Sequence, residues 1–318
     1  MLSAWRKMGE TVNQILTIPY ELVWRDETPL VVLAEISDDK IHTTFWGTAL
    51  DKYARRSAIL PLDDVVLNGN ERKFTGSIHH ITRCGSTSLL QQIGALDRVF
   101  GLSEPFIFLE LLSRPGAETR LAEIRVRKLA CLFGSGLAPV ADQIVVKWPT
   151  LLCRHARLLD KALGDAPSVF LSRNPVEVLR SIEMRPLLQM ENLALEYVLG
   201  PDFDETPSPL PAGLALVAHM LAANCRWIAQ SAKTRRLDYR QLPDIGWQKV
   251  APAFGLSLDD RQTAKMKRSA GVNAKQPGAT FVSDSCEKRE TASVLAQSLA
   301  SSILQPAIDE ACAQLQPL

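Results

Sequence analysis

The chain has 318 residues, of which 46% are hydrophobic and 22% charged, and its formal net charge is +1. This balance is that of an ordinary globular protein, and the length fits one large α/β domain with a cap, or two domains. A net charge near zero excludes a global field that would draw the protein to nucleic acid or an anionic polysaccharide, although a local basic cleft is still allowed.

Targeting and redox features indicate a cytoplasmic protein. The first ten residues contain Arg6, Lys7 and Glu10 and no apolar run, unlike a secretory signal. The longest apolar stretch, near Gly213–Cys225, is shorter than the roughly 20 residues of a membrane span and predicts a buried core helix. The six cysteines are scattered, without a CxxC pair or a Cys/His cluster at metal-ligand spacing. We therefore expect reduced thiols, no metal centre and no membrane span.

The N-terminal residues 1–73 are expected to form a strand-rich cap that packs on the core. Short strand-like runs occur at Tyr20–Trp24, Leu30–Leu33 and Ile41–Trp46. Turn signals at Asp38-Asp39 and Asn68-Gly69-Asn70 separate or follow them.

From Phe74 onward the pattern changes to alternating strands and helices. The predicted strands are Phe74–Ile81, Val99–Leu102, Gln143–Lys147, Ser168–Leu171 and Arg235–Tyr239. The predicted helices are Ser88–Leu96, Leu121–Leu132, Leu151–Leu163, Pro175–Ile182 and Leu214–Ala232. Continuous apolar strands between helices predict a three-layer α/β/α domain over 74–318 with a central, mainly parallel sheet. Ligands of such sheets bind at the carboxyl ends of the strands.

The first polar cluster is a strand–loop–helix segment that resembles a phosphate-binding loop. Its loop residues are Arg83, Cys84, Gly85, Ser86, Thr87 and Ser88. Backbone N–H groups and the positive end of a helix at such a loop bind phosphate, and the hydroxyl groups add donors. An ordinary helix capped by a Ser or Thr side chain is the structural alternative.

This loop departs from the nucleoside-triphosphate loop GxxxxGK[ST]. Alignment of Gly85 with the second glycine places His80 at the first glycine and Ser86 at the lysine. Both departures argue against an ATPase or GTPase. The cation of the loop is instead Arg83.

The second polar cluster follows the strand that ends near Leu171. Arg173, Asn174 and Pro175 lead into a helix, and Ser181 lies on that helix. An arginine fork with a serine hydroxyl is a suitable grip for a second phosphate. The alternative is an ordinary capped helix with Arg173 in a surface salt bridge.

The two clusters together resemble the family of sulfotransferases that depend on 3′-phosphoadenosine 5′-phosphosulfate (PAPS), of the bacterial type. In that family a Lys or Arg precedes xGxTT or xGSTS, and a later strand is followed by R-[DN]-P-x-[DE]-V-x-x-S. The resemblance spans roughly Phe74 to Ser285 and implies a P-loop-like fold. It implies that Arg83 and the loop hold the 5′-phosphosulfate, and that Arg173 and Ser181 hold the 3′-phosphate.

Three further positions resemble the family less closely. Lys147 ends a strand, as a lysine does in the family, and would be catalytic. Tyr239 stands where the family has a Y-E-D-L strand end, but Arg240 and Gln241 replace the usual acids. Lys275 lies in a late polar loop that would contact the nucleotide, although the RKGxxGDW pattern of the cytosolic animal enzymes is missing.

The catalytic base is left open between one glutamate and three histidines. Glu104 closes a short strand next to the loop, where several sulfotransferase families carry a catalytic glutamate. His79 and His80 lie on the strand before the loop and face opposite sides of the sheet, so that at most one points to the site, and a core role is expected for them. His155 is expected on a helix surface. Arg83, Glu104 and Lys147 are the catalytic candidates.

The predicted activity is transfer of a sulfo group from PAPS to a hydroxyl of a small-molecule or carrier-bound acceptor, without a metal. Acceptor specificity would come from the N-terminal residues and from a possible lid at 183–211, which is apolar and then Pro-rich. The rivals are a nucleotide-dependent small-molecule kinase and a non-catalytic nucleotide-binding regulatory protein. The acceptor, the pathway and the oligomeric state are not predicted.

Overall fold

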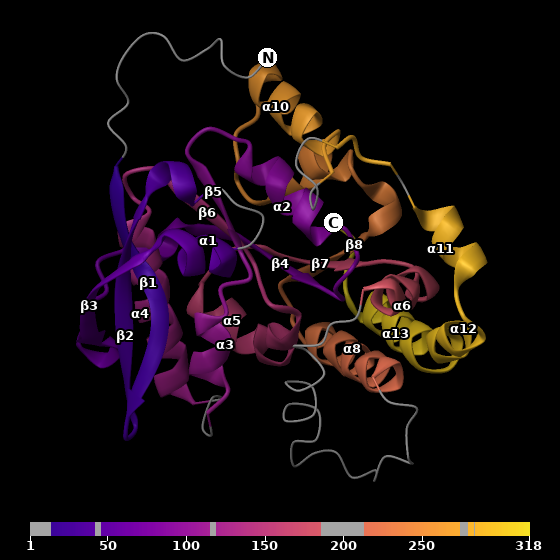
Figure 1. The fold of residues 1–318 in the computed structure, drawn as a ribbon, viewed down its shortest axis with the longest axis horizontal. Coiled ribbons are helices and arrows are strands. Elements are labelled where there is room, and N and C mark those ends of the chain that lie inside the picture. The colour runs from indigo at the N-terminus through magenta and orange to yellow at the C-terminus, as the bar shows by residue number, and fades with distance from the viewer. Residues whose placement is uncertain (1–13, 42–45, 115–118, 186–212, 274–278, 283) are drawn as a thin grey trace.

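Two β-sheets organise the chain in a computed structural model, which describes residues 14–41, 46–114, 119–185, 213–273, 279–282 and 284–318 (Figure 1). One sheet has three strands and the other has five. The smaller sheet comes from the N-terminal residues, and the larger one carries the polar clusters.

The smaller sheet is antiparallel and contains β1 (Ile15–Arg25), β2 (Thr28–Ser37) and β3 (Arg55–Pro61). The first two predicted strands lie within β1 and β2 and are confirmed. Residues 42–45 of the predicted strand at 41–46 lie outside the described residues; its last residue, Trp46, begins a helix, α1 (Trp46–Tyr53), and the third strand of the sheet follows that helix. Ala49 and Leu50 of α1 are buried.

The small sheet packs through β1 on α3 (Ile107–Leu112) and α4 (Arg120–Gly136). Figure 1 shows it at one end of the molecule, beside these helices and the edge strand of the larger sheet. The division into a cap over 1–73 and a domain over 74–318 stays a prediction. Residues 186–211 of the possible lid lie outside the described residues.

The larger sheet is parallel throughout, with the strand order β5-β6-β4-β7-β8. Its strands are β4 (Phe74–His80), β5 (Val99–Ser103), β6 (Gln143–Lys147), β7 (Ser168–Ser172) and β8 (Thr234–Asp238). All five were predicted, with bounds that differ by no more than one residue. Every residue of β7 is buried, as expected for a strand covered on both faces.

Helices cover both faces of this sheet and make three layers. Figure 1 shows α2 (Ser86–Gly94) and α10 (Asp260–Ala270) over one face, with α5 (Ala156–Ala162), α8 (Leu214–Ala229) and α13 (Gln305–Gln314) over the other. The remaining α-helices are α6 (Pro175–Met184), α9 (Ala251–Ala253), α11 (Ser285–Thr291) and α12 (Val294–Leu299). The three-layer α/β/α architecture is therefore confirmed.

Short 3-10 and π-helical segments complete the described elements. They are the 3-10 segments Asp38–Lys40, Leu62–Asp64, Asn70–Lys73, Thr150–His155 and Tyr239–Gln241, and the π segments Gly246–Val250 and Ala300–Leu304. The apolar stretch near residue 220 forms α8, and most of that helix is buried, as predicted for a core helix. Within the described part of the chain, no helix has the length and apolarity to cross a membrane.

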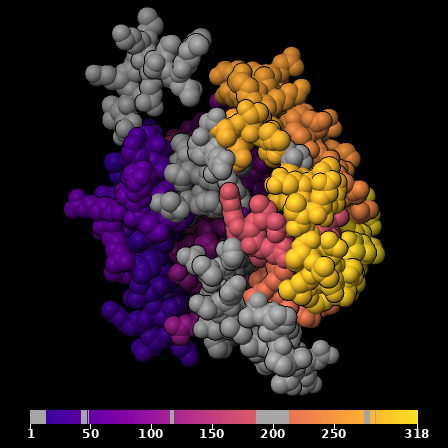
Figure 2. All heavy atoms as spheres, turned by 45° about the vertical axis from the view of Figure 1, so that its right-hand side comes forward, coloured from indigo at the N-terminus to yellow at the C-terminus, as the bar shows by residue number. Residues whose placement is uncertain are grey.

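The C-terminal helices return to the second polar cluster. In Figure 2 the gold helices α11 and α12 lie against the pink atoms of α6, and both helices contact α6. The end of the chain thus reaches the site formed by β7 and α6.

Candidate active site

The carboxyl ends of the parallel strands meet at one edge of the larger sheet. Lys147, the last residue of β6, pairs with Ser103 of β5 and with Ile78 of β4. Leu171 of β7 pairs with His80, the last residue of β4. The segments that follow these strands therefore start at the same level, and the two polar clusters lie side by side.

A cavity of about 490 Å³ opens at this edge. Most of the residues predicted to bind a nucleotide line it, namely Arg83, Gly85, Ser86, Thr87, Ser88, Arg173, Ser181 and Tyr239. Cys84 does not line it, because its side chain is fully buried within the loop. Lys275 lies outside the described residues.

The loop before α2 has a left-handed backbone and an uncapped helix end. Thr82, Arg83 and Gly85 have positive φ angles of 58°, 47° and 87°. Gly85 is the N-cap residue of α2, and no side chain caps this helix end. The alternative of a helix capped by Ser or Thr is therefore not realised in the described part of the chain. The Ser86 N–H lies against the Cys84 thiol, and the other N–H groups of the first turn have no side-chain cap that would keep them from an anion. Two non-glycine residues in the left-handed region are a strain typical of ligand-binding loops.

Arg83 is a cation without a carboxylate partner among the described residues. Its Nη2 donates a hydrogen bond to the carbonyl oxygen of Arg185 at 3.0 Å, and its buried Nε has no partner there. Burial and the neighbouring Arg185 lower the pKa of Arg83. A partly desolvated cation that lines a cavity is stabilised by a bound anion.

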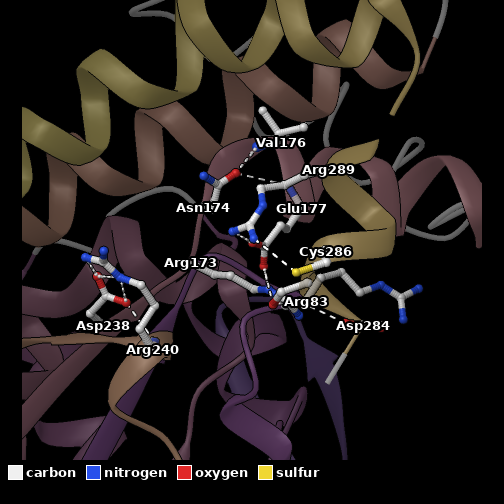
Figure 3. A network of polar contacts seen from close by, with 11 residues as sticks. Arg83, Arg173, Asn174, Val176, Glu177, Asp238, Arg240, Asp284, Cys286 and Arg289 are labelled. Atoms are coloured by element: carbon white, nitrogen blue, oxygen red, sulfur yellow. Dashed lines mark hydrogen bonds and ion pairs between the residues drawn. The ribbon is translucent and has the colours of Figure 1, made fainter. Parts of the chain in front are cut away.

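Arg173 lies at the centre of a buried polar network (Figure 3). Its Nε donates to Glu177 Oε2 at 2.6 Å, and its Nη1 to the carbonyl oxygen of Arg83 at 3.3 Å. Its Nη2 donates to Asp284 Oδ1 at 2.9 Å and to Ser285 Oγ at 3.1 Å. Burial would lower the pKa of Arg173, but the hydrogen bonds to Asp284 and Glu177 outweigh it and raise the pKa. Arg173 is thus not in the surface salt bridge that was its alternative role.

Tyr239 connects the two polar clusters. The Arg173 guanidinium lies 4.0 Å from the centre of the Tyr239 ring, a cation–π contact. A Cβ atom on Gly85 would lie 2.9 Å from the same ring. Asn174 caps α6 by accepting the Val176 N–H, so a ligand is left with the side of this helix, where Ser181 lines the cavity.

Sequence reasoning missed the cations of α11. Lys288 is buried and its Nζ lies 2.7 Å from Asp284 Oδ2, while Arg289 Nη1 donates to Glu177 Oε1 at 3.0 Å. Both cations line the cavity. The available signal was a Lys-Arg pair one helical turn after the late polar loop, whereas the interpretation placed the late cation at Lys275.

A second cluster, next to the loop, contains Glu104 and Lys147. Lys147 Nζ lies 2.8 Å from Glu104 Oε1 and donates to Thr87 Oγ1 at 3.1 Å. His80 Nε2 lies 3.5 Å from the same Glu104 oxygen. Glu104 has a positive φ angle of 50°, and its N–H donates to the carbonyl oxygen of Lys147. The three predicted catalytic residues therefore meet at one loop. Arg83 belongs to the loop, Lys147 binds Thr87 of the same loop, and Glu104 binds Lys147.

The electrostatics of this cluster keep Glu104 ionised. Burial would raise the pKa of Glu104, but the Lys147 ammonium and the contact with His80 outweigh it and hold the pKa well below its ordinary value. Glu104 therefore carries a negative charge at neutral pH.

His80 is held in one orientation by the start of the loop. Its Nδ1 accepts the N–H of Thr82 at 3.0 Å, and the Thr150 hydroxyl lies 3.2 Å from the same nitrogen. We therefore assign the ring proton to Nε2, which faces Glu104. Of the two neighbouring histidines, His80 is the one that faces Glu104, although His80, Glu104 and Lys147 do not themselves line the cavity.

The other two histidines lie elsewhere. His79 is fully buried, its ring nitrogens have no hydrogen-bond partner among the described residues, and burial lowers its pKa to about 3. It does not line the cavity. His155 was expected on a helix surface, and this is wrong, because it is buried at the end of the 3-10 segment that packs on α8.

No protein-family model matches the chain, and no curated protein matches it. Two similar solved structures are a sulfotransferase domain from the curacin biosynthetic pathway and a sulfotransferase from Alicyclobacillus acidocaldarius. The first is 13% identical over 76% of this chain and 98% of its own, with a TM-score of 0.43. The second is 15% identical over 77% of this chain and 97% of its own, also with a TM-score of 0.43. A likeness of this size carries no conclusion about activity, which has to come from the geometry of the site itself.

Proposed function

We propose that the chain is a PAPS-dependent sulfotransferase that modifies a hydroxyl of a small-molecule or carrier-bound acceptor and releases 3′,5′-adenosine bisphosphate. The observation that carries the proposal is the meeting of two phosphate-type sites in one cavity. Arg83 with its loop and Arg173 with Ser181 come from different strands, yet Arg173 donates a hydrogen bond to the backbone of Arg83. A ligand with two separate anionic groups suits this arrangement.

The cavity offers a place for each part of the donor. The N–H groups at the start of α2 and Arg83 would hold the 5′-phosphosulfate, and Arg173, Ser181 and Lys288 would hold the 3′-phosphate. Apolar side chains suited to a base ring also line the cavity, namely Leu242, Pro243, Phe281 and Val282.

The neighbouring cluster supplies what sulfo transfer needs. An acceptor oxygen attacks the sulfur, a new S–O bond forms, and the S–O bond to the 5′-phosphate breaks. The proton of the acceptor hydroxyl goes to Glu104, and the charge that develops on the phosphate oxygen is stabilised by Arg83 and the loop N–H groups. Lys147 contacts both Glu104 and Thr87, so its charge lies between the base and the leaving group.

The kinase alternative shares the fold but needs a different loop. A nucleoside-triphosphate loop places a lysine where this chain has Ser86. A purely regulatory nucleotide-binding protein would not need the ionised Glu104 beside the loop. We propose further that the N-terminal residues 1–73 and the segment 183–211 shape the acceptor side.

The test is thermal unfolding with 3′,5′-adenosine bisphosphate, ATP–Mg²⁺ or ADP. A ligand at 100 times its dissociation constant stabilises the folded state by about 2.7 kcal/mol. We expect this stabilisation with the bisphosphate and not with the other two, and we expect Arg173→Ala to abolish it. Arg180→Ala is the matched control, because Arg180 lies on α6, bonds Thr291 and Glu183, and does not line the cavity. Stabilisation by ATP–Mg²⁺ alone would favour the kinase.

A further inference from the structure

A carboxylate of the protein itself occupies the second phosphate-type site. Asp284 Oδ1 accepts from Arg173 Nη2 at 2.9 Å, and Asp284 Oδ2 lies 2.7 Å from Lys288 Nζ (Figure 3 shows the contact with Arg173). The carboxylate thus bridges two cations with its two oxygens. A phosphate that bound both cations would use the same two nitrogen atoms.

Burial shows which part of this contact is fixed. The side chains of Arg173 and Lys288 are 5% and 8% exposed, whereas that of Asp284 is 46% exposed. Arg173 also pairs with Glu177, so loss of Asp284 would leave Lys288 as the nearly buried cation that needs another anion, because an unpaired buried charge is costly. The half-exposed carboxylate is the one member of the group that can move out to solvent.

Glu177 has a different place in the network. It is 3% exposed and binds the Nε edge of Arg173, with Ser285 and Arg289 as its other partners. It therefore orients the guanidinium at the Nε edge and leaves the Nη2 atom to Asp284 and Ser285. Displacement of Asp284 does not require Glu177 to move.

We infer that Asp284 is a built-in competitor for the 3′-phosphate of the nucleotide, an inference that rests on the proposed function. When the 3′-phosphate enters, the Asp284 carboxylate leaves Arg173 and Lys288, and phosphate oxygens take its place. A nucleotide with a free 3′-hydroxyl has no anion to replace the carboxylate, so Asp284 stays. Asp284 thereby weakens the complex with the bisphosphate product and acts only on ligands that carry a 3′-phosphate.

The experiment compares Asp284→Ala and Asp284→Asn with the wild type in calorimetric titrations at constant ionic strength. The probes are 3′,5′-adenosine bisphosphate and 5′-AMP. Loss of a competing charge-assisted contact is expected to tighten bisphosphate binding by about tenfold in Asp284→Ala. Binding of 5′-AMP should stay within about twofold, since its 3′-hydroxyl does not compete.

The matched control is Glu287→Gln, which removes one negative charge from the same helix. Glu287 is exposed, and its side chain does not line the cavity. Equal tightening in Glu287→Gln, or equal tightening of 5′-AMP in Asp284→Ala, would mean that a general change of field acts, and would overturn the inference. Weaker or unchanged bisphosphate binding in both Asp284 variants would overturn it as well.

A second readout is thermal unfolding with inorganic phosphate. Without phosphate, Asp284→Ala should unfold at a lower temperature than the wild type. Added phosphate should raise the unfolding temperature of the variant more than that of the wild type. If Asp284→Ala does not fold, Asp284→Asn gives the answer, because it keeps the shape and loses the charge. If the wild type binds the bisphosphate and neither Asp284 variant binds it more tightly, the inference fails and the proposed function stands. Absence of bisphosphate binding in the wild type and both variants defeats the proposed function too.

Discussion

Replacement of Lys147 by methionine is expected to destabilise the fold through the charge left on Glu104. The Lys147 side chain is 1% exposed and that of Glu104 is 22% exposed, with 2.8 Å between Nζ and Oε1. Methionine keeps most of the apolar stem and removes the charge. Breaking a buried ion pair costs about 3–5 kcal/mol, and the partial exposure of Glu104 indicates the lower end, about 3 kcal/mol at pH 7.

The loss of stability should depend on pH. The folded-state pKa of Glu104 is lowered, against the effect of burial, mainly by Lys147 and His80. A lowered pKa stabilises the fold fully above the unfolded value of ~4.3, and this contribution is lost as the pH falls below it. In Lys147→Met the ammonium that opposes the effect of burial is missing, so the pKa of Glu104 rises and its carboxylate is protonated at a higher pH. The difference between wild type and variant should therefore shrink from pH 7 to pH 5.

Urea unfolding followed by circular dichroism at both pH values measures this difference. The double variant Lys147→Met with Glu104→Gln should be more stable than Lys147→Met alone at pH 7, because no charge is left unpaired. Equal destabilisation at both pH values, together with additive effects in the double variant, would refute the reasoning.

Three further predictions concern the loop and the base. Gly85→Ala should cost about 1–2 kcal/mol in urea unfolding because of the positive φ angle, and should reduce bisphosphate binding through the contact with Tyr239; an unchanged titration counts against the proposed loop. Glu104→Gln should lower kcat by about 10²–10⁴-fold with any acceptor found and leave the bisphosphate Kd within about threefold, whereas full activity would exclude Glu104 as the base. His80→Asn keeps an acceptor for the Thr82 N–H but removes the ring nitrogen that faces Glu104, so the pKa of Glu104 should rise. The acidic limb of the kcat–pH profile should then move to higher pH, and an unmoved limb would show that His80 does not act on Glu104.

The parallel sheet could be predicted because its strands carry their own signal. Runs such as Gln143–Lys147 are apolar throughout and end in polar residues, so both the strand and its carboxyl end can be read from the sequence. The loop and Arg173 both follow carboxyl ends of parallel strands, so their place at the same edge of the sheet could also be predicted. The small sheet was harder, because the run at 41–46 is too short for its period to distinguish a strand from the helix that begins at Trp46.

The contacts of Arg173 could not be predicted, because they join distant parts of the chain. Asp284 and Ser285 lie more than a hundred residues after Arg173, and neither spacing nor composition indicates that α11 returns to α6. The burial of His155 likewise depends on where α8 packs. Local patterns predict elements, whereas such tertiary contacts depend on how the elements pack.

The most direct test of the account follows the fate of oxygen and sulfur when PAPS is turned over. The protein is incubated with PAPS labelled in its sulfur and a series of simple phenols and alcohols in ¹⁸O-water, and the products are analysed by mass spectrometry. The account predicts 3′,5′-adenosine bisphosphate without ¹⁸O and labelled sulfur on an acceptor hydroxyl, with both products reduced in Glu104→Gln. Recovery of PAPS intact, or ¹⁸O in the bisphosphate, which would mean that the P–O bond breaks, would contradict it.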